Sequence, residues 1–198
     1  AFINANTLTT SSVGGTTLNN ANTLANFNAT NATSGNVSLI NSANPLTLTG
    51  IAQSGGNVIV SNTGGINLSG NINAGANNVS LTSSAAIAET ASAFINANLL
   101  TTSSVGGTVL TNANTISNFN ATNATSGNIS FTNTAAPLNI TGINQSGVGN
   151  LTINNTGAIT QSGGVIQTSG LATLSSGAAN NINLSGSNNF VTLAIGSA

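Results

Sequence analysis

The sequence is almost without charge. Its 198 residues include no Lys, Arg, His or Cys, and its single acidic residue is Glu89. Side chains of these types supply the general bases, nucleophiles, phosphate clamps and metal ligands of most enzymes. We therefore predict that the protein is not an enzyme and has no catalytic, cofactor-binding or metal-binding residues. Nucleic-acid partners are not expected either, because basic groups are needed to displace counterions from the phosphate backbone.

Long apolar runs are also missing. A membrane-spanning helix needs about 20 consecutive apolar residues, and the runs here are far shorter, so no membrane span is predicted. The sequence begins at Ala1, not at Met, and nothing in it resembles a secretory signal, so a mature piece or an excerpt of a longer chain is expected. A surface with so little charge favours an extracellular or cell-surface location.

The residues that are present favour paired β-strands. Disordered chains are typically charged and poor in Val, Ile and Leu, whereas this chain combines apolar residues with Asn, Ser, Thr and Gly. No apolar stripe with the period of a helix appears, which argues against helices. Uncharged strand edges must be covered to avoid aggregation, and a closed coil covers them along its whole length.

A short repeat runs through positions 35–81. Three near-copies begin at Asn36, Asn57 and Asn78, which are equally spaced, and apolar pairs lie between them at 46/48 and 66/68. Each period therefore holds three short apolar segments separated by Gly, Asn, Ser and Pro. This pattern predicts an all-β protein: a right-handed parallel β-helix, or β-solenoid, with about 20 residues and three short strands per rung.

Apolar residues spaced by this period fall into three columns, which we expect to stack inside the coil. Within a strand, alternation should point Val37 and Leu39 inward and Ser38 outward. The predicted columns of the first half are Leu8, Phe27, Leu46, Ile66 and Ile87; Val13, Ala32, Ile51 and Ile72; and Leu18, Val37, Val58 and Val79. Those of the second half are Leu100, Phe119, Leu138 and Ile159; Val105, Ala124, Ile143 and Val165; and Leu110, Ile129, Leu151 and Ala172.

A second, longer repeat has a period of 92. AFINANTLTTSSVGGTTL at position 1 returns as AFINANLLTTSSVGGTVL at position 93, and a one-residue insertion later lengthens the offset to 93. We predict one continuous solenoid over residues 1–198 that consists of two tandem repeats, 1–92 and 93–198. With eight to ten rungs at roughly 4.8 Å each, the rod would be about 40–45 Å long. The interval from Ile87 to Leu100 is too short for a rung, so residues 90–97 are expected to form a short turn or a loop that bulges outward.

A few residues are candidates for function. Glu89 is expected to be a solvated residue of an irregular junction, although an ion or the terminus of a neighbouring subunit are alternatives. The repeated Asn36, Asn57 and Asn78 are expected to form a hydrogen-bonded ladder. Asn-x-Ser/Thr triplets, such as those at 28–30, 31–33 and 120–122, are either glycan acceptors or chance occurrences. Thr pairs at 7/9 and 47/49 are typical of ice-binding solenoids but do not recur at the same point of successive turns.

Two stretches resemble a known family. GGINLSGNINAGANNVSLTSSAAI at 64–87 and GAITQSGGVIQTSGLATLSSGAANNINLSGSNNF at 157–190 are similar to the repeat regions of large exported bacterial proteins of the filamentous haemagglutinin type. The resemblance covers most of the chain and lies in the kind of residues used and in the repeat period, not in an invariant motif. It implies a right-handed parallel β-helix, secretion through a partner barrel, and roles in adhesion, biofilm or contact between cells. It implies no site residues, because such repeats are scaffold.

The favoured function is therefore structural: a building block of an extracellular bacterial fibre, stalk or adhesin. Copies are expected to join head to tail in a filament, or the unit to form part of a longer chain, because neither end shows a polar capping repeat. Ser197-Ala198 followed by a new Phe2 would also recreate the internal junction Ser92-Ala93-Phe94. The alternative is a glycan-binding adhesin module that recognises cell-surface glycans, and an ice-binding solenoid is less favoured.

Overall fold

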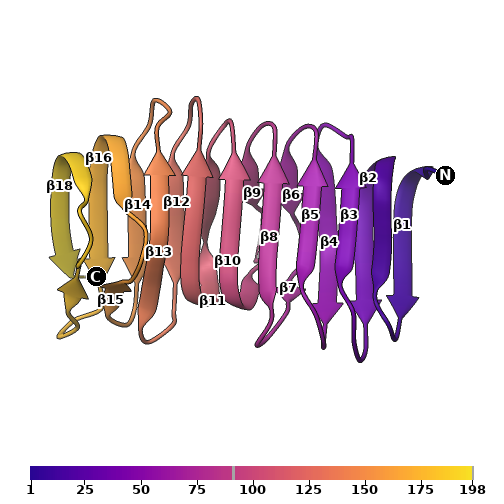
Figure 1. Ribbon diagram of the computed structural model, residues 1–198, viewed down its shortest axis with the longest axis horizontal. Helices are drawn as coiled ribbons and strands as arrows, with labels where there is room; N and C mark the ends of the chain where they lie inside the picture. Colours follow the sequence, from indigo (N-terminus) through magenta and orange to yellow (C-terminus); the bar gives the residue numbers. More distant parts are fainter. Residues whose placement is uncertain (91, 198) are drawn as a thin grey trace.

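The protein is a parallel β-solenoid. The computed structural model describes residues 1–90 and 92–197. In this part of the chain there is no helix, every strand pairing is parallel, and about nine turns follow one another at a spacing of about 21 residues. The two ends of the chain lie at opposite ends of a rod (Figure 1), whose length is about 43 Å at ~4.8 Å per turn. The predicted fold class, a right-handed parallel β-helix, is confirmed.

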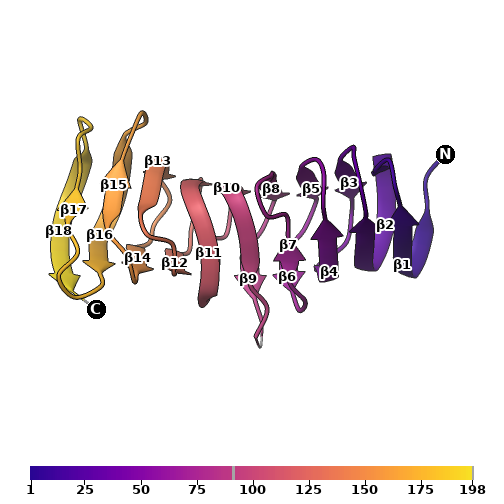
Figure 2. The same ribbon diagram turned by 90° about the horizontal axis from the view of Figure 1, so that it is seen from below.

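Two long faces enclose the interior of the coil, and they lie on opposite sides in Figure 2. The first face comprises the start of β2 (Thr16–Asn31), β3 (Val37–Asn41), β5 (Val58–Asn62), β8 (Asn78–Ser83), the later parts of β10 (Ile95–Ser104) and β11 (Thr108–Asn123), β13 (Leu138–Gln145), β15 (Ile159–Gln161) and β17 (Ile182–Asn183). The second face comprises β1 (Asn4–Ser12), the later part of β2, β4 (Leu46–Gln53), β6 (Ile66–Leu68), β9 (Ile87–Glu89), the start of β11, β12 (Ile129–Asn133), β14 (Leu151–Asn155), the later part of β16 (Ile166–Ser176) and β18 (Asn189–Ser197).

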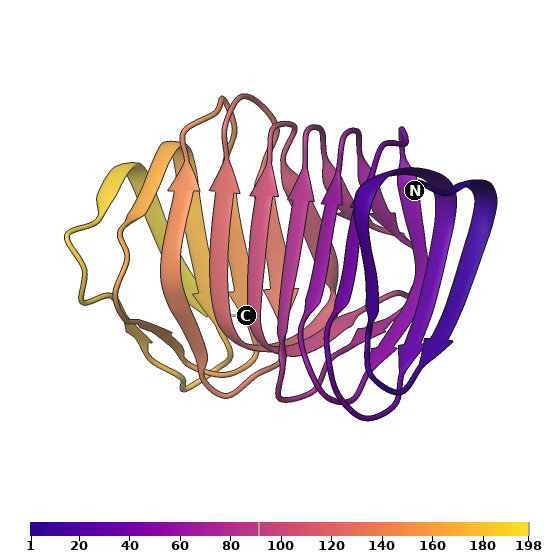
Figure 3. The same ribbon diagram turned by 45° about the vertical axis from the view of Figure 1, so that its right-hand side comes forward.

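The number of strands in a turn varies. The turn formed by β5, β6 and β7 (Ile72–Asn73) has the three short strands that the sequence predicts. In the preceding turn, the single strand β4 runs past a bend at Gly50 and pairs with both β6 and β7. Figure 3 shows the chain passing around the rod turn after turn.

The two long repeats face opposite ways. β3 lies on the first face, but β12, its counterpart in the second repeat, lies on the second; β4 and β13 are exchanged in the same manner (Figure 2). The cause is arithmetic. Starting from Val37, the in-register partners are Val58, Val79, Leu100 and Phe119, so four turns end at position 119. The repeat ends at position 129 (37 + 92), half a turn further on, and it therefore equals about four and a half turns.

This half turn explains the segment that the sequence left unplaced. Leu100 pairs with Val79 of the preceding turn, and Ile87 pairs with Thr108 of the following turn. The expectation of a short turn is confirmed at Ser92, where the chain turns and the backbone N–H of Ala93 donates to the carbonyl oxygen of Thr90 (3.3 Å). It is wrong for residues 95–97, because Ile95 begins the regular strand β10. Of that segment, Ala91 lies outside the described residues, as does Ala198 at the end of the second predicted repeat.

One predicted column is wrong in part, and the others hold with local shifts in register. Val37, Val58 and Val79 are stacked and fully buried as expected. In contrast, Val13 is 65% exposed and Val105 is 38% exposed. Ile51, Ile72 and Ile143 lie in this column as predicted, but their partners are Ala29 in the first repeat and Ala121 and Ile166 in the second.

The size of each register shift decides its effect. Ala29, not Ala32, pairs with Ile51, and this shift of three positions moves Ala32 to the outside because side chains alternate with a period of two. Ala124 and Val165 are exposed likewise. A shift of two keeps a side chain inside: Phe27 pairs with Leu48 where Leu46 was predicted. The other such shifts pair Leu18 with Leu39, Leu110 with Phe131, and Phe119 with Ile140.

The interior is apolar along its centre and lined with amides at its corners. Phe119 from the first face stacks on Phe131 from the second, with ring centroids 4.2 Å apart and an interplanar angle of 13°. At a corner, the buried Asn62 accepts a hydrogen bond from Asn41 Nδ2 (3.0 Å) and donates to the carbonyl oxygens of Ala43 and Gly65 (2.8 Å each). Equivalent bonds join Asn31 to Gln53 (2.6 Å) and Asn133 to Asn155 (3.0 Å). Buried amides thus satisfy backbone groups where the strands end.

Glycine is required where successive corners touch. Gly35 has φ +78° and Gly56 has φ +132°, both in the left-handed region. A Cβ atom on Gly35 would clash with the carbonyl oxygen of Gly14, and one on Gly56 with the carbonyl oxygen of Gly35. These corners therefore stack backbone against backbone, which keeps the strands of adjacent turns in register.

Candidate functional site

Glu89, the only ionisable side chain in the chain, lies on the inner side of β9. It is in register with the buried Leu68 of the preceding turn. Its Oε2 atom accepts hydrogen bonds from the backbone N–H of Asn112 (3.0 Å) and from Nδ2 of Asn114 (3.4 Å). Its Oε1 atom is buried and has no hydrogen-bond partner within the described chain. The expectation of a solvated residue is therefore wrong: the carboxyl group takes a place that apolar side chains fill in neighbouring turns.

Burial changes the acidity of this group. Loss of water around Glu89 raises the pKa of its carboxyl group from 4.5 to about 6, and the hydrogen bonds from Asn112 and Asn114 only partly oppose this effect. A raised pKa is one sign of a functional acid, but catalysis also needs a partner group. Glycoside hydrolysis, for example, needs two carboxyl groups, and the sequence has one acidic side chain. No cluster of metal-ligating side chains occurs among the residues searched, 1–90 and 92–197.

The Asn ladder forms at a partly exposed corner, and two of its three bonds run from side chain to backbone instead of from amide to amide. Asn36 Oδ1 accepts the backbone N–H of Asn57 (2.9 Å), and Asn57 Oδ1 accepts that of Asn78 (3.1 Å). Asn78 Oδ1 accepts Nδ2 of Asn98 (3.2 Å). The ladder thus ties successive turns at one corner, a structural role.

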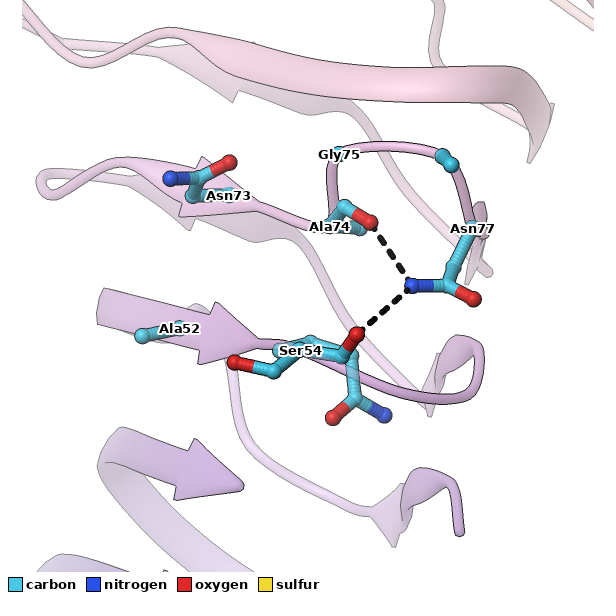
Figure 4. A pocket seen from close by; sticks show the side chains of 8 residues that line it. Ala52, Ser54, Asn73, Ala74, Gly75 and Asn77 are labelled. Carbon is cyan, nitrogen blue, oxygen red and sulfur yellow. Dashed lines mark hydrogen bonds between the residues drawn. The ribbon is translucent and has the colours of Figure 1, made fainter. Parts of the chain in front are cut away.

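A groove opens on the outside of the first repeat, where the short β7 lies between β4 and β10. Two adjoining hollows, of about 430 and 290 Å³, share Ala52 and Asn73 in their linings. Figure 4 shows the larger one between Ser54 and the turn at Ala74 and Gly75. Sequence reasoning missed this groove. The only signal was the close spacing of Gly and Ala with Asn in residues 70–77.

The remaining candidate motifs are the Asn-x-Thr triplets and the Thr pairs, and the Asn residues of the triplets differ in their burial. Asn31 and Asn123 of the Asn-x-Thr triplets are fully buried, whereas Asn28 and Asn120 are partly exposed on strands. The Thr pairs do not form a continuous array: Asn26 separates Thr7 from Thr47 in the stack. No helix among the described residues is long and apolar enough to cross a membrane.

Comparisons with known proteins found no relative. No family model matches the chain, and no match was found among curated proteins or solved structures. The β-solenoid architecture is compatible with the filamentous haemagglutinin resemblance, and membership of that family is not demonstrated.

Proposed function

We propose that this chain is a non-enzymatic structural module of an extracellular bacterial fibre, stalk or adhesin of the filamentous haemagglutinin type. The main support is the way in which the coil uses its polar groups. The buried amides bond to corner backbone, and the Asn ladder bonds from turn to turn. These polar groups keep the rod regular, and few polar groups remain that could take part in a reaction.

We further propose that the rods join end to end, by covalent continuation or by axial stacking of copies. The main support for end-to-end joining is that each end strand has one free edge. β1 pairs only with β2, and β18 pairs only with β16. On β18, Leu193 and Ile195 continue the inward columns of Ala172 and Leu174, but they are 39% and 56% exposed. An unpaired edge with exposed apolar side chains is a surface that another β-turn can cover. A head-to-tail contact of this kind produces an open filament unless its rotation closes a ring.

Electron microscopy of the purified chain tests axial stacking. We expect straight, unbranched fibres with an axial repeat of about 43 Å. They should persist from low to high salt, because no ion pairs hold them. Ile195→Lys, which places a charge in the inward column of the end strand, should abolish the fibres. Ala194→Lys is the matched control, because Ala194 alternates with the inward positions of the same strand. Single rods that stay monomeric at high concentration would refute axial stacking.

A further inference from the structure

The groove over β7 has features that the scaffold does not require. Gly50 and Ala52 line it with little or no side chain, and Gly75 has open space where a Cβ atom would lie. The outward side chains of Asn28, Asn71 and Asn73 lie along it. The result is a hollow with a small apolar floor and amide walls.

Three amides of the groove retain free hydrogen-bonding capacity. Asn71 Oδ1 accepts the backbone N–H of Phe94 (3.2 Å), and Asn73 Oδ1 accepts Nδ2 of Asn96 (3.1 Å). Those bonds fix the two amide groups, while neither Nδ2 donates to any described residue. The amide of Asn28 makes no side-chain hydrogen bond within residues 1–90 and 92–197. In contrast, Asn77 at the groove's edge uses its Nδ2 on the carbonyl oxygens of Ala74 (2.9 Å) and Ser54 (3.5 Å), as Figure 4 shows.

The second repeat differs at these positions: it closely matches the first up to Gly147 and diverges beyond that point, which includes the counterpart of Asn71. Asn144 stands where the first repeat has Ala52, and Val165 precedes the Ile166 that stacks on Ile143, as Asn71 precedes Ile72. The same turn of the solenoid is therefore built without the small floor residue and without the Asn71 donor. The solenoid is thus compatible with other residues at these two positions, so the fold by itself does not require Ala52 or the free Nδ2 of Asn71.

We propose that this groove binds a neutral saccharide. Uncharged amide donors match the hydroxyl and ring oxygens of a sugar, and the floor at Ala52 offers an apolar contact for its C–H groups. Sulfated, phosphorylated or sialylated ligands are bound most strongly through a cationic side chain, and the chain has no Lys, Arg or His. A peptide added as an extra strand would need an unpaired edge. Here β7 is paired on both sides, with β4 and with β10.

A glycan array that carries neutral, sialylated and sulfated sugars is the first test, followed by titration with the best neutral oligosaccharide. An open groove of this size predicts a Kd of roughly 10 µM to 1 mM. Ala52→Trp should fill the groove and weaken binding by more than about tenfold, whereas Asn73→Ala, which removes one donor, should weaken it about fivefold. Asn144→Trp is the matched control, because it makes the equivalent change on the opposite face and should bind as the wild type does.

Several outcomes would overturn the proposal: no binding to any neutral sugar, binding to charged glycans alone, or unchanged binding by Ala52→Trp. Binding of neutral peptides that is lost in Ala52→Trp would assign the groove to peptides instead. Far-UV circular dichroism checks that each variant folds. If Ala52→Trp does not fold, Asn73→Ala decides, because its side chain is exposed. Fibre formation by the same samples tests the proposed structural function separately.

Discussion

The protein has one titratable side chain, and this makes the pH dependence of its stability simple. Glu89 has a raised pKa, about 6 in the folded protein against 4.5 for the free group, because burial disfavours its charged form. At a pH below 4.5 the group is protonated in both the folded and the unfolded states. Between pH 4.5 and 6 the unfolded chain releases the proton while the folded chain retains it, so folding becomes less favourable as the pH rises. Above about pH 6 the stability no longer changes through this group.

The magnitude follows from the two pKa values. A difference of about 1.5 corresponds to about 2 kcal/mol of unfolding free energy, at about 1.4 kcal/mol per pKa unit. Glu89 is only half-buried, and solvent screening of its charge reduces the expected effect to about 1 kcal/mol. Glu89→Gln removes the charge and retains a carbonyl oxygen for the N–H of Asn112. We expect this variant to be about 1 kcal/mol more stable than the wild type at pH 7 and equal to it at pH 4.

Urea unfolding at pH 4, 5, 6 and 7 measures both proteins. The chain has no Trp or Tyr, so far-UV circular dichroism is the appropriate signal. The wild-type midpoint should fall as the pH rises from 4.5 to 6, while the midpoint of Glu89→Gln should stay constant. The reasoning is refuted if the wild type becomes more stable over that range, or if both proteins show the same dependence.

Two further substitutions test the interior. Val58→Asp puts a charge in a fully buried column and should destabilise the protein by several kcal/mol. Ile59→Asp, on the exposed side of the same strand, is the control, and similar unfolding midpoints for the two variants would contradict the inward position of Val58. Asn62→Ala removes the acceptor for Asn41 and the donor to two corner carbonyl oxygens, which should cost about 1–3 kcal/mol in thermal or urea unfolding. Ser61→Ala is its neighbouring control, and equal stability of the two variants would show that the corner bonds contribute little.

The short period of the sequence was sufficient to predict the class of fold. Val37, Val58 and Val79 are identical residues at a constant interval, and they do stack in the interior. In a parallel coil, residues separated by a constant interval become neighbours in adjacent turns. A constant interval in the sequence therefore predicts the topology. The two tandem copies were also visible directly in the sequence.

The tertiary structure alone decided how the copies are oriented and which side chains face inward. The long repeat is not a whole number of turns, so repeat-equivalent residues such as Val37 and Ile129 lie on opposite faces, although sequence alignment placed them in one column. Bends at corners alter the register by a few positions, and an odd shift turns a side chain from the interior to the surface, as at Val13. The inward position of Glu89 follows the period itself, because Glu89 pairs with Leu68 at the regular interval. The groove beside Ala52 depends on which small side chains face outward there, and only the tertiary structure shows that. A repeat period gives the mean advance of the chain per turn, whereas the orientation of the copies and the shifts that expose Val13 depend on departures from that mean.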